Sequence, residues 1–231
     1  MGMASSAAAS GHGDPSGPRD RPPRRRGRGG AGGEWSHEAL RRGAAPSEVL
    51  AELDATVAPL RELPGAERLR WTAPQGRHLT LAFLGAVDEE RLPALEDGLA
   101  QAVLGHPVHR LRLAGGGHFH DRVLWVGLAG ETWALRGLAR SVTTVTGEVL
   151  GEEAPDLGEE VAFHPHLTLA RAGRSGHPDA EERKALRTAA QRLETFQGAD
   201  FTVAAVHLMR SEFHGGPAQY TRVRSWALHP A

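Results

Sequence analysis

Apolar residues recur along this chain with two different periods, and the two periods predict a mixture of helices and strands. In four stretches they return every three or four positions, which is the spacing of one buried helix face. These helices are expected at about residues 46–61, 89–103, 131–150 and 179–196. Shorter apolar runs bounded by turn residues predict strands at 68–71, 78–84, 109–113, 123–128, 166–171, 201–210 and 220–228. Helices and strands follow one another in the same rough order in each half, which indicates an α+β fold of two related lobes.

One pentapeptide occurs twice in the chain. Residues 78–82 and 166–170 both read HLTLA, within the longer stretches RHLTLAFLG and PHLTLARAG. Alternate residues of a strand point to the same face, so each copy places its His and its Thr together and its two leucines on the opposite, core-facing side. The repeat indicates two copies of one structural unit, and two such units facing each other would form a symmetric pocket.

The side chains of the repeat are suited to acid–base chemistry on a phosphate. The pKa of a free imidazole, about 6.5, lets His78 and His166 give or take a proton near neutrality. Placed on opposite sides of a substrate, they could act as general acid and general base in one step. Thr80 and Thr168 could donate hydrogen bonds to phosphate oxygens. One His-x-Thr triplet alone is more simply read as ordinary strand sequence, whereas two identical pentapeptides are not.

These motifs resemble those of the 2H phosphoesterase superfamily, in particular its RNA 2′,3′-cyclic phosphodiesterase branch, which includes the 2′-5′ RNA ligase-like proteins. The matching stretches are RWTAPQGRHLTLAFLG, RVLWVGL, FHPHLTLAR and HLMRSEF with YTRVRSWAL, all within residues 46–228. The resemblance implies a bilobal duplication of two antiparallel-rich sheets with flanking helices and the active cleft between the lobes. It also implies an enzyme, a hydrolase that opens RNA 2′,3′-cyclic phosphate ends to 2′-phosphates with neither metal nor cofactor.

The resemblance further implies a role for each motif residue. His78 would protonate the departing 3′ oxygen, His166 would activate water, and Thr80 and Thr168 would position the phosphate; the residues alone do not decide which histidine is acid and which is base. The resemblance also favours Arg171 as an anion-binding residue. Five positions after His166, Arg171 should point to the opposite face of a regular strand, so this role requires a bulge or the long reach of its side chain.

Several other side chains could contribute to a site. Phe119, in the predicted loop AGGGHFHD, could stack on a base of the RNA substrate. His118 and His120 could ligate a metal, but no third ligand is identifiable, so we interpret them as part of a solvated loop. Arg77 is expected to be exposed to solvent. His164 would share the catalytic face only if its strand started early.

The N-terminal region differs from the rest of the chain. Residues 1–33 are rich in Gly, Ser, Ala, Pro and Arg and show no apolar periodicity, so we expect disorder. Residues 34–45 lack the apolar strand that members of the family usually have before their first helix. We therefore interpret residues 1–45 as a tail, which could reflect a non-native start, and residues 46–231 as a single bilobal domain. If the tail is native, one sheet should lack a strand.

Composition adds limits on partners and location. The absence of cysteine excludes disulfides and thiolate metal sites, and no run approaches the ~20 apolar residues of a membrane-spanning helix. Residues 45–231 carry 19 basic and 24 acidic side chains, so affinity for RNA must come from a local patch. We expect a cytoplasmic monomer acting on RNA with a 2′,3′-cyclic phosphate end. The alternatives are a phosphodiesterase of small cyclic nucleotides and a catalytically silent RNA-binding module; neither the physiological RNA nor a retained ligase activity can be deduced.

Overall fold

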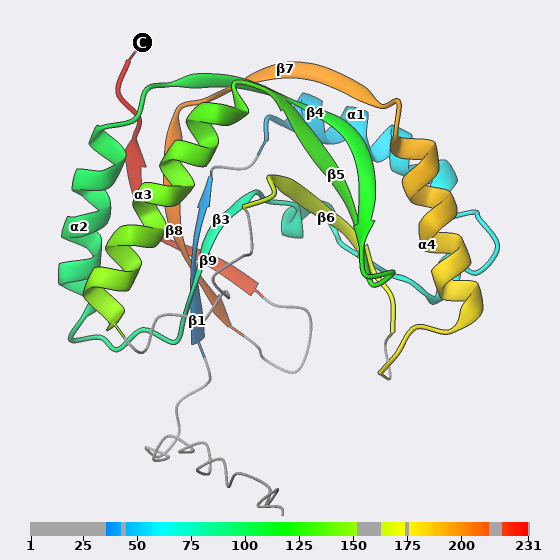
Figure 1. Ribbon diagram of the computed structural model, residues 1–231, viewed down its shortest axis with the longest axis horizontal. Helices are drawn as coiled ribbons and strands as arrows, with labels where there is room; N and C mark the ends of the chain where they lie inside the picture. The colour runs from blue at the N-terminus through cyan, green and yellow to red at the C-terminus, as the bar shows by residue number, and fades with distance from the viewer. Residues whose placement is uncertain (1–35, 43–44, 152–162, 174–175, 213–218, 231) are drawn as a thin grey trace, which may run out of the picture. The chain divides into compact units, whose positions relative to one another are not determined.

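Two antiparallel β-sheets with helices packed against them make up the part of the chain that the computed structural model describes, residues 36–42, 45–151, 163–173, 176–212 and 219–230 (Figure 1). One sheet has the order β3 (Thr80–Gly85), β1 (Ser36–Arg42), β8 (Ala205–Glu212) and β9 (Gln219–Ala227). The other has the order β2 (Arg70–Trp71), β6 (His166–Arg171), β5 (Val123–Gly130), β4 (His109–Phe119) and β7 (Gln197–Val203). The predicted α+β class with two antiparallel-rich sheets is therefore confirmed.

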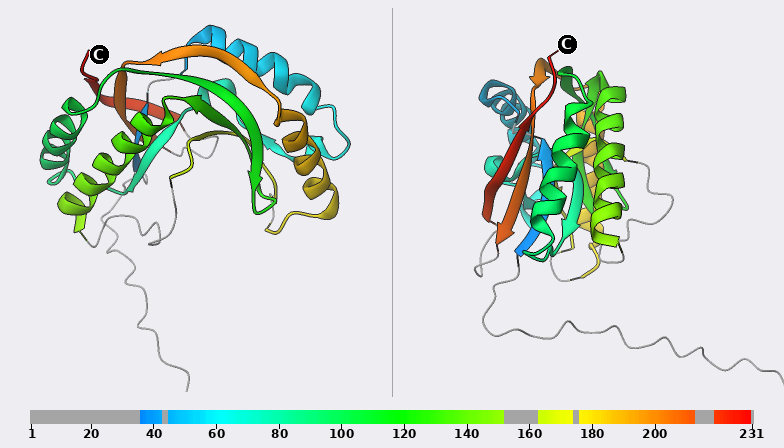
Figure 2. Two further views of the ribbon diagram at one scale, coloured as in Figure 1. Left: turned by 45° about the horizontal axis from the view of Figure 1, so that its top comes forward. Right: turned by 90° about the vertical axis from the view of Figure 1, so that its left-hand side faces the viewer.

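The four predicted helices are present within the described residues, with ends that differ by a few residues from those expected (Figure 2). They are α1 (Ser47–Val57), α2 (Leu92–Leu104), α3 (Thr132–Leu150) and α4 (Ala180–Leu193). The start of α4 is set by a capping box, in which the Asp179 side chain accepts from the Glu182 N–H and the Glu182 side chain accepts from the Asp179 N–H, both at 2.9 Å. No described helix is long and apolar enough to cross a membrane.

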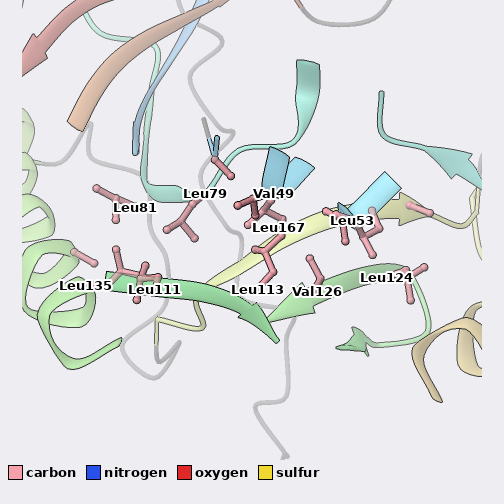
Figure 3. Close-up of a cluster of buried hydrophobic side chains, with 14 of the residues drawn as sticks. Val49, Leu53, Leu79, Leu81, Leu111, Leu113, Leu124, Val126, Leu135 and Leu167 are labelled. Atoms are coloured by element: carbon pink, nitrogen blue, oxygen red, sulfur yellow. The ribbon is translucent and has the colours of Figure 1, made fainter. Parts of the chain in front are cut away.

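The two pentapeptides pack against one shared hydrophobic core. Leu79 and Leu81 of the first copy and Leu167 and Leu169 of the second are all buried and belong to the same cluster. Figure 3 shows Leu79, Leu81 and Leu167 in this cluster, together with residues of α1, β4 and β5. Because the leucines of both copies point into one core, the intervening residues of both copies are directed away from it.

Two predicted strand boundaries are corrected by the structure. The single strand predicted at 201–210 is in fact two strands, because the chain leaves the five-stranded sheet at Val203 and joins the four-stranded sheet at Ala205. Strand β4 continues to Phe119, so most of the predicted loop AGGGHFHD is strand. The hairpin turns over residues 120–122, since Phe119 pairs with Val123. The Arg122 N–H donates to the Phe119 carbonyl at 2.8 Å, and His120 and Asp121 between them have positive φ values of 48° and 54°.

The expectation that one sheet lacks a strand is wrong. Residues Ser36–Arg42 form β1 in the middle of the four-stranded sheet, paired with β8 in an unbroken register and with β3 through two register shifts. Apolar periodicity reports side chains only, whereas a sheet is joined by backbone N–H and C=O groups that almost any residue supplies. Strand structure thus begins before residue 46, and the rest of the predicted tail, residues 1–35, 43 and 44, lies outside the described residues.

Candidate active site

The two copies of the repeated stretch have the same pattern of exposure. Over residues 77–85 and 165–173, buried, half-buried and exposed positions follow in the same order, with His and Thr half-buried in each copy. Each copy ends at a glycine with a left-handed backbone, Gly85 at φ 73° and Gly173 at φ 78°, a conformation that favours residues without a Cβ. The predicted alternation within the pentapeptides is confirmed, and the duplication extends to backbone conformation.

A bulge in each copy changes which face the later residues occupy. The pairing of β6 with β5 skips Leu169, and the pairing of β3 with β1 skips the equivalent Leu81. An extra residue in a strand reverses the alternation beyond it. Arg171 is therefore exposed and lies on the same face as His166 and Thr168, which meets the condition that the sequence set for this residue.

The chain connects the two motifs directly. Strand β2 pairs with β6, and the Thr72 N–H donates to the carbonyl of Leu169 at 2.8 Å. Six residues after Thr72 the chain reaches His78, at the entrance to β3. Figure 3 shows Leu79, next to His78, and Leu167, next to His166, in one cluster of buried side chains. Two strands of different sheets thus carry the two motifs over a common core.

His166 is held in one tautomer by the backbone. Its Nδ1 lies 2.7 Å from the carbonyl oxygen of His164, and because a carbonyl can only accept, Nδ1 carries the proton. In the neutral ring, Nε2 then has the lone pair. Burial lowers the pKa of His166, the hydrogen bond to the His164 carbonyl opposes this, and the charges of His164 and Arg171 lower it further. The net effect favours a neutral imidazole whose Nε2 can accept a proton.

An aromatic cluster surrounds the His166 imidazole. The ring of Phe119 meets it edge-on at 5.0 Å between centroids, and Phe119 also contacts Trp125 at 5.4 Å. His164 packs edge-on against Trp125 at 4.6 Å, and burial lowers the pKa of His164, with a further contribution from Arg136. Phe119 thus lies beside the predicted catalytic histidine, on a strand and not in a loop. Trp125, which falls in the matching stretch RVLWVGL, also belongs to this cluster, and neither its spacing nor its residue type distinguishes it from an ordinary core tryptophan.

The surroundings of His78 were not foreseen. Its ring contacts Tyr220 of β9 edge-on, with 5.2 Å between centroids. The preceding Arg77, expected to be exposed, is only 1% exposed and forms an ion pair of 2.6 Å with Asp54 of α1. A partner on a helix that packs against the sheets explains how the guanidinium can be buried, and a single sequence does not reveal such a pair.

The His-x-His segment takes part in an ion-pair network on the surface. His118 Nδ1 lies 3.3 Å from Asp121 Oδ1, and Asp121 also accepts two hydrogen bonds from Arg187. The hydrogen bond from Arg187 lowers the pKa of Asp121. Among the described residues, no three His, Asp or Glu side chains form a group that could hold a metal ion.

Comparison with known proteins gives consistent matches. The family model described as the 2′-5′ RNA ligase superfamily matches residues 46–214. An RNA 2′,3′-cyclic phosphodiesterase of Thermus thermophilus is 34% identical over 193 residues, which cover 79% of this chain and 86% of that protein. One from Escherichia coli is 31% identical over 163 residues, covering 69% and 80% respectively.

Solved structures agree with the fold. TT0787 of Thermus thermophilus superposes with a TM-score of 0.64 at 28% identity, covering 83% of this chain and 97% of that one. The apo form of Escherichia coli LigT superposes with a TM-score of 0.62 at 25% identity, covering 85% of this chain and 99% of that one.

Proposed function

Because this chain belongs to the 2′-5′ RNA ligase superfamily, we propose that it hydrolyses the 2′,3′-cyclic phosphate end of RNA and leaves a 2′-phosphate. The relatives from Thermus thermophilus and Escherichia coli, at 34% and 31% identity, carry the name RNA 2′,3′-cyclic phosphodiesterase. The observation that carries the proposal is the duplicated His-Thr unit, with matching exposure in both copies and both sets of leucines in one core. Binding alone would not require two matched imidazoles.

In the proposed reaction, water attacks phosphorus while the bond from phosphorus to the 3′ oxygen breaks. His166 takes the proton of the attacking water at Nε2, the nitrogen left unprotonated by the hydrogen bond from Nδ1. His78 gives a proton to the departing 3′ oxygen, which leaves as a hydroxyl. The two rings end with exchanged protonation states, and proton exchange with solvent restores them.

The remaining motif residues would stabilise charge on the phosphate. Thr80 and Thr168 would donate hydrogen bonds to its non-bridging oxygens, where negative charge accumulates in the transition state. Arg171, on the same face as His166, would bind the same oxygens through a charge-assisted hydrogen bond. Phe119 would stack on a base. The two imidazoles supply both proton transfers, so the proposed reaction requires no metal.

Product analysis on a defined RNA end tests this proposal. An oligonucleotide with a 2′,3′-cyclic phosphate is incubated with the protein in EDTA, and the 2′- and 3′-phosphate products are separated. We expect only the 2′-phosphate, at the same rate with and without EDTA. No product, a 3′-phosphate product or a requirement for added metal would contradict the proposal. Comparison with cyclic mononucleotides separates an RNA enzyme from one that acts on small cyclic phosphates.

A further inference from the structure

A pocket of about 280 Å³ lies beside the aromatic cluster around His166. Its volume is near the lower end, about 300 Å³, of pockets that hold small molecules, so one ring system fits better than a dinucleotide. Its walls combine apolar and aromatic surface with three polar groups. The lining residues are Ala114, Gly115, Gly116, Trp125, Gly127, Leu128, Arg136, His164, Pro165 and Glu194.

Glycines allow the indole of Trp125 to lie against the sheet. Gly117 is directly opposite Trp125 on the neighbouring strand, and a Cβ added to it would lie 2.4 Å from the indole Cζ2. Gly127 lies two residues after Trp125 on β5, and a Cβ added to it would lie 3.3 Å from the indole Cζ3. Side chains at these two positions would displace the ring. The glycines of β4 and β5 thus make room for a flat aromatic surface at the pocket.

The pocket lies close to His166, the proposed general base. The centroids of the Trp125 and His166 rings are 6.4 Å apart, and the rings of His164 and His166 are 6.2 Å apart. A base attached to the same ribose as the reacting cyclic phosphate would be held at a comparable short distance from the catalytic histidine. The pocket is therefore placed for the terminal nucleotide.

The polar groups of the walls suit the edge of a base. Arg136 donates one hydrogen bond to the Phe163 carbonyl at 2.8 Å and has further N–H donors, and Glu194 contributes acceptors. The wall thus offers both kinds of group that base edges require.

From this arrangement we propose that the pocket binds the base of the nucleotide that carries the cyclic phosphate, with Trp125 as its principal stacking surface. The proposal rests on the proposed function. It assigns to Trp125 a part in substrate binding that is separate from the proton transfers of the two motif histidines. Stacking tolerates any base, because every base has a π face.

Steady-state kinetics of Trp125→Leu on two substrates test the proposal. One substrate is adenosine 2′,3′-cyclic phosphate, and the other is 1,4-anhydroribitol 2,3-cyclic phosphate, which has the ring and the cyclic phosphate but no base. Loss of one stacking partner should lower kcat/KM for the adenosine substrate on the order of 10- to 100-fold, mainly through KM, and leave the base-free substrate unchanged. The matched control is Trp133→Leu, since Trp133 is an exposed tryptophan of α3 that does not line the pocket; it should change neither rate.

Equal losses on both substrates, or no loss on either, would overturn the assignment, because a structural role for Trp125 would affect both. Trp125→Phe is the second variant if Trp125→Leu does not fold, and it should show a smaller loss confined to the adenosine substrate. If the wild type hydrolyses neither small substrate, the subsite is tested by equilibrium dialysis with adenosine 2′-monophosphate, and the proposed function is judged separately on the cyclic-phosphate-ended oligonucleotide. Binding at least tenfold weaker in the Trp125 variant would then support the subsite, and equal binding would refute it.

Discussion

Replacing Asp54 by Asn would leave the buried guanidinium of Arg77 without its carboxylate. The Arg77 side chain is fully buried, Asp54 is 40% exposed, and the two groups are 2.6 Å apart. Removing one partner of a buried pair costs about 3–5 kcal/mol. Because water can partly reach the Asp54 position, we expect the lower end, about 3 kcal/mol in the free energy of unfolding. For a chain of this size that loss would lower Tm by roughly 6–12 °C.

Replacing the guanidinium should cost less than removing its partner. The Nε and Nη2 atoms of Arg77 are buried without a hydrogen-bond partner among the described residues, so the side chain already carries unsatisfied donors. Arg77→Met removes these donors, fills similar volume and leaves Asp54 partly hydrated, at an expected cost of about 1 kcal/mol. The double variant should then be more stable than Asp54→Asn alone, since no buried charge remains.

Urea unfolding followed by circular dichroism gives all three free energies in one experiment. The matched control is Arg68→Met, which breaks the ion pair between Arg68 and Asp179, at 2.7 Å but with both side chains about half exposed. Screening by water makes such surface pairs contribute little, so this variant should change stability much less than Asp54→Asn. If Asp54→Asn were no more destabilising than Arg68→Met, the reasoning about the buried pair would be refuted.

Three further predictions concern pH and backbone. Burial lowers the pKa of the proposed base His166, so the midpoint of the acidic limb of the kcat/KM profile should fall below pH 6.5. A midpoint above pH 6.5 would contradict the assignment of His166 as the base. Burial also lowers the pKa of His106 and His164, so below about pH 6.5 the unfolded chain binds more protons. Stability should therefore rise from pH 5 to 7, seen as a higher urea midpoint; a flat profile would contradict this. Gly173 has a φ of 78°, and a Cβ added to it would lie 2.6 Å from a backbone oxygen, so Gly173→Ala should lower the free energy of unfolding by about 1–3 kcal/mol. Gly147 of α3 has open space around its Cβ position, so Gly147→Ala should raise the free energy of unfolding. Equal effects of the two substitutions would contradict the prediction that Ala at position 173 is strained.

Much of the fold could be predicted because burial is periodic. The spacing of apolar residues predicts the helices and most strands, and the repeated pentapeptide indicates which of its side chains face the core. Its leucines, such as Leu79 and Leu167, are buried as the alternation requires. The sequence alone predicts Arg171 on the face of His166 only if the strand contains a bulge. The alternation of apolar and polar residues does not reveal a bulge, because a bulge is a property of the register between two strands.

The features that could not be predicted from the sequence depend on main-chain hydrogen bonds and on contacts between residues far apart in the chain. Strand β1 is joined by main-chain pairing, which apolar periodicity does not report. The tautomer of His166 is set by a carbonyl group, and every residue has one. The burial of Arg77 depends on a partner 23 residues earlier on a helix, and His78 contacts Tyr220, which lies near the C-terminus. Such contacts exist only once the sheets and helices have packed.

The central claim is that His78 and His166 act as one acid–base pair, and a double-mutant cycle on a cyclic-phosphate-ended oligonucleotide tests it most directly. Single-turnover rates are measured for His78→Ala, His166→Ala and the double variant, with His118→Ala as the control outside the site. Each single replacement should slow hydrolysis on the order of 10²–10⁴-fold, because one proton transfer is lost. The double variant should be slowed far less than the product of the two losses, because groups that act as a unit are not additive. Losses that multiply, or a near-normal rate in either single variant while His118→Ala abolishes turnover, would contradict the account.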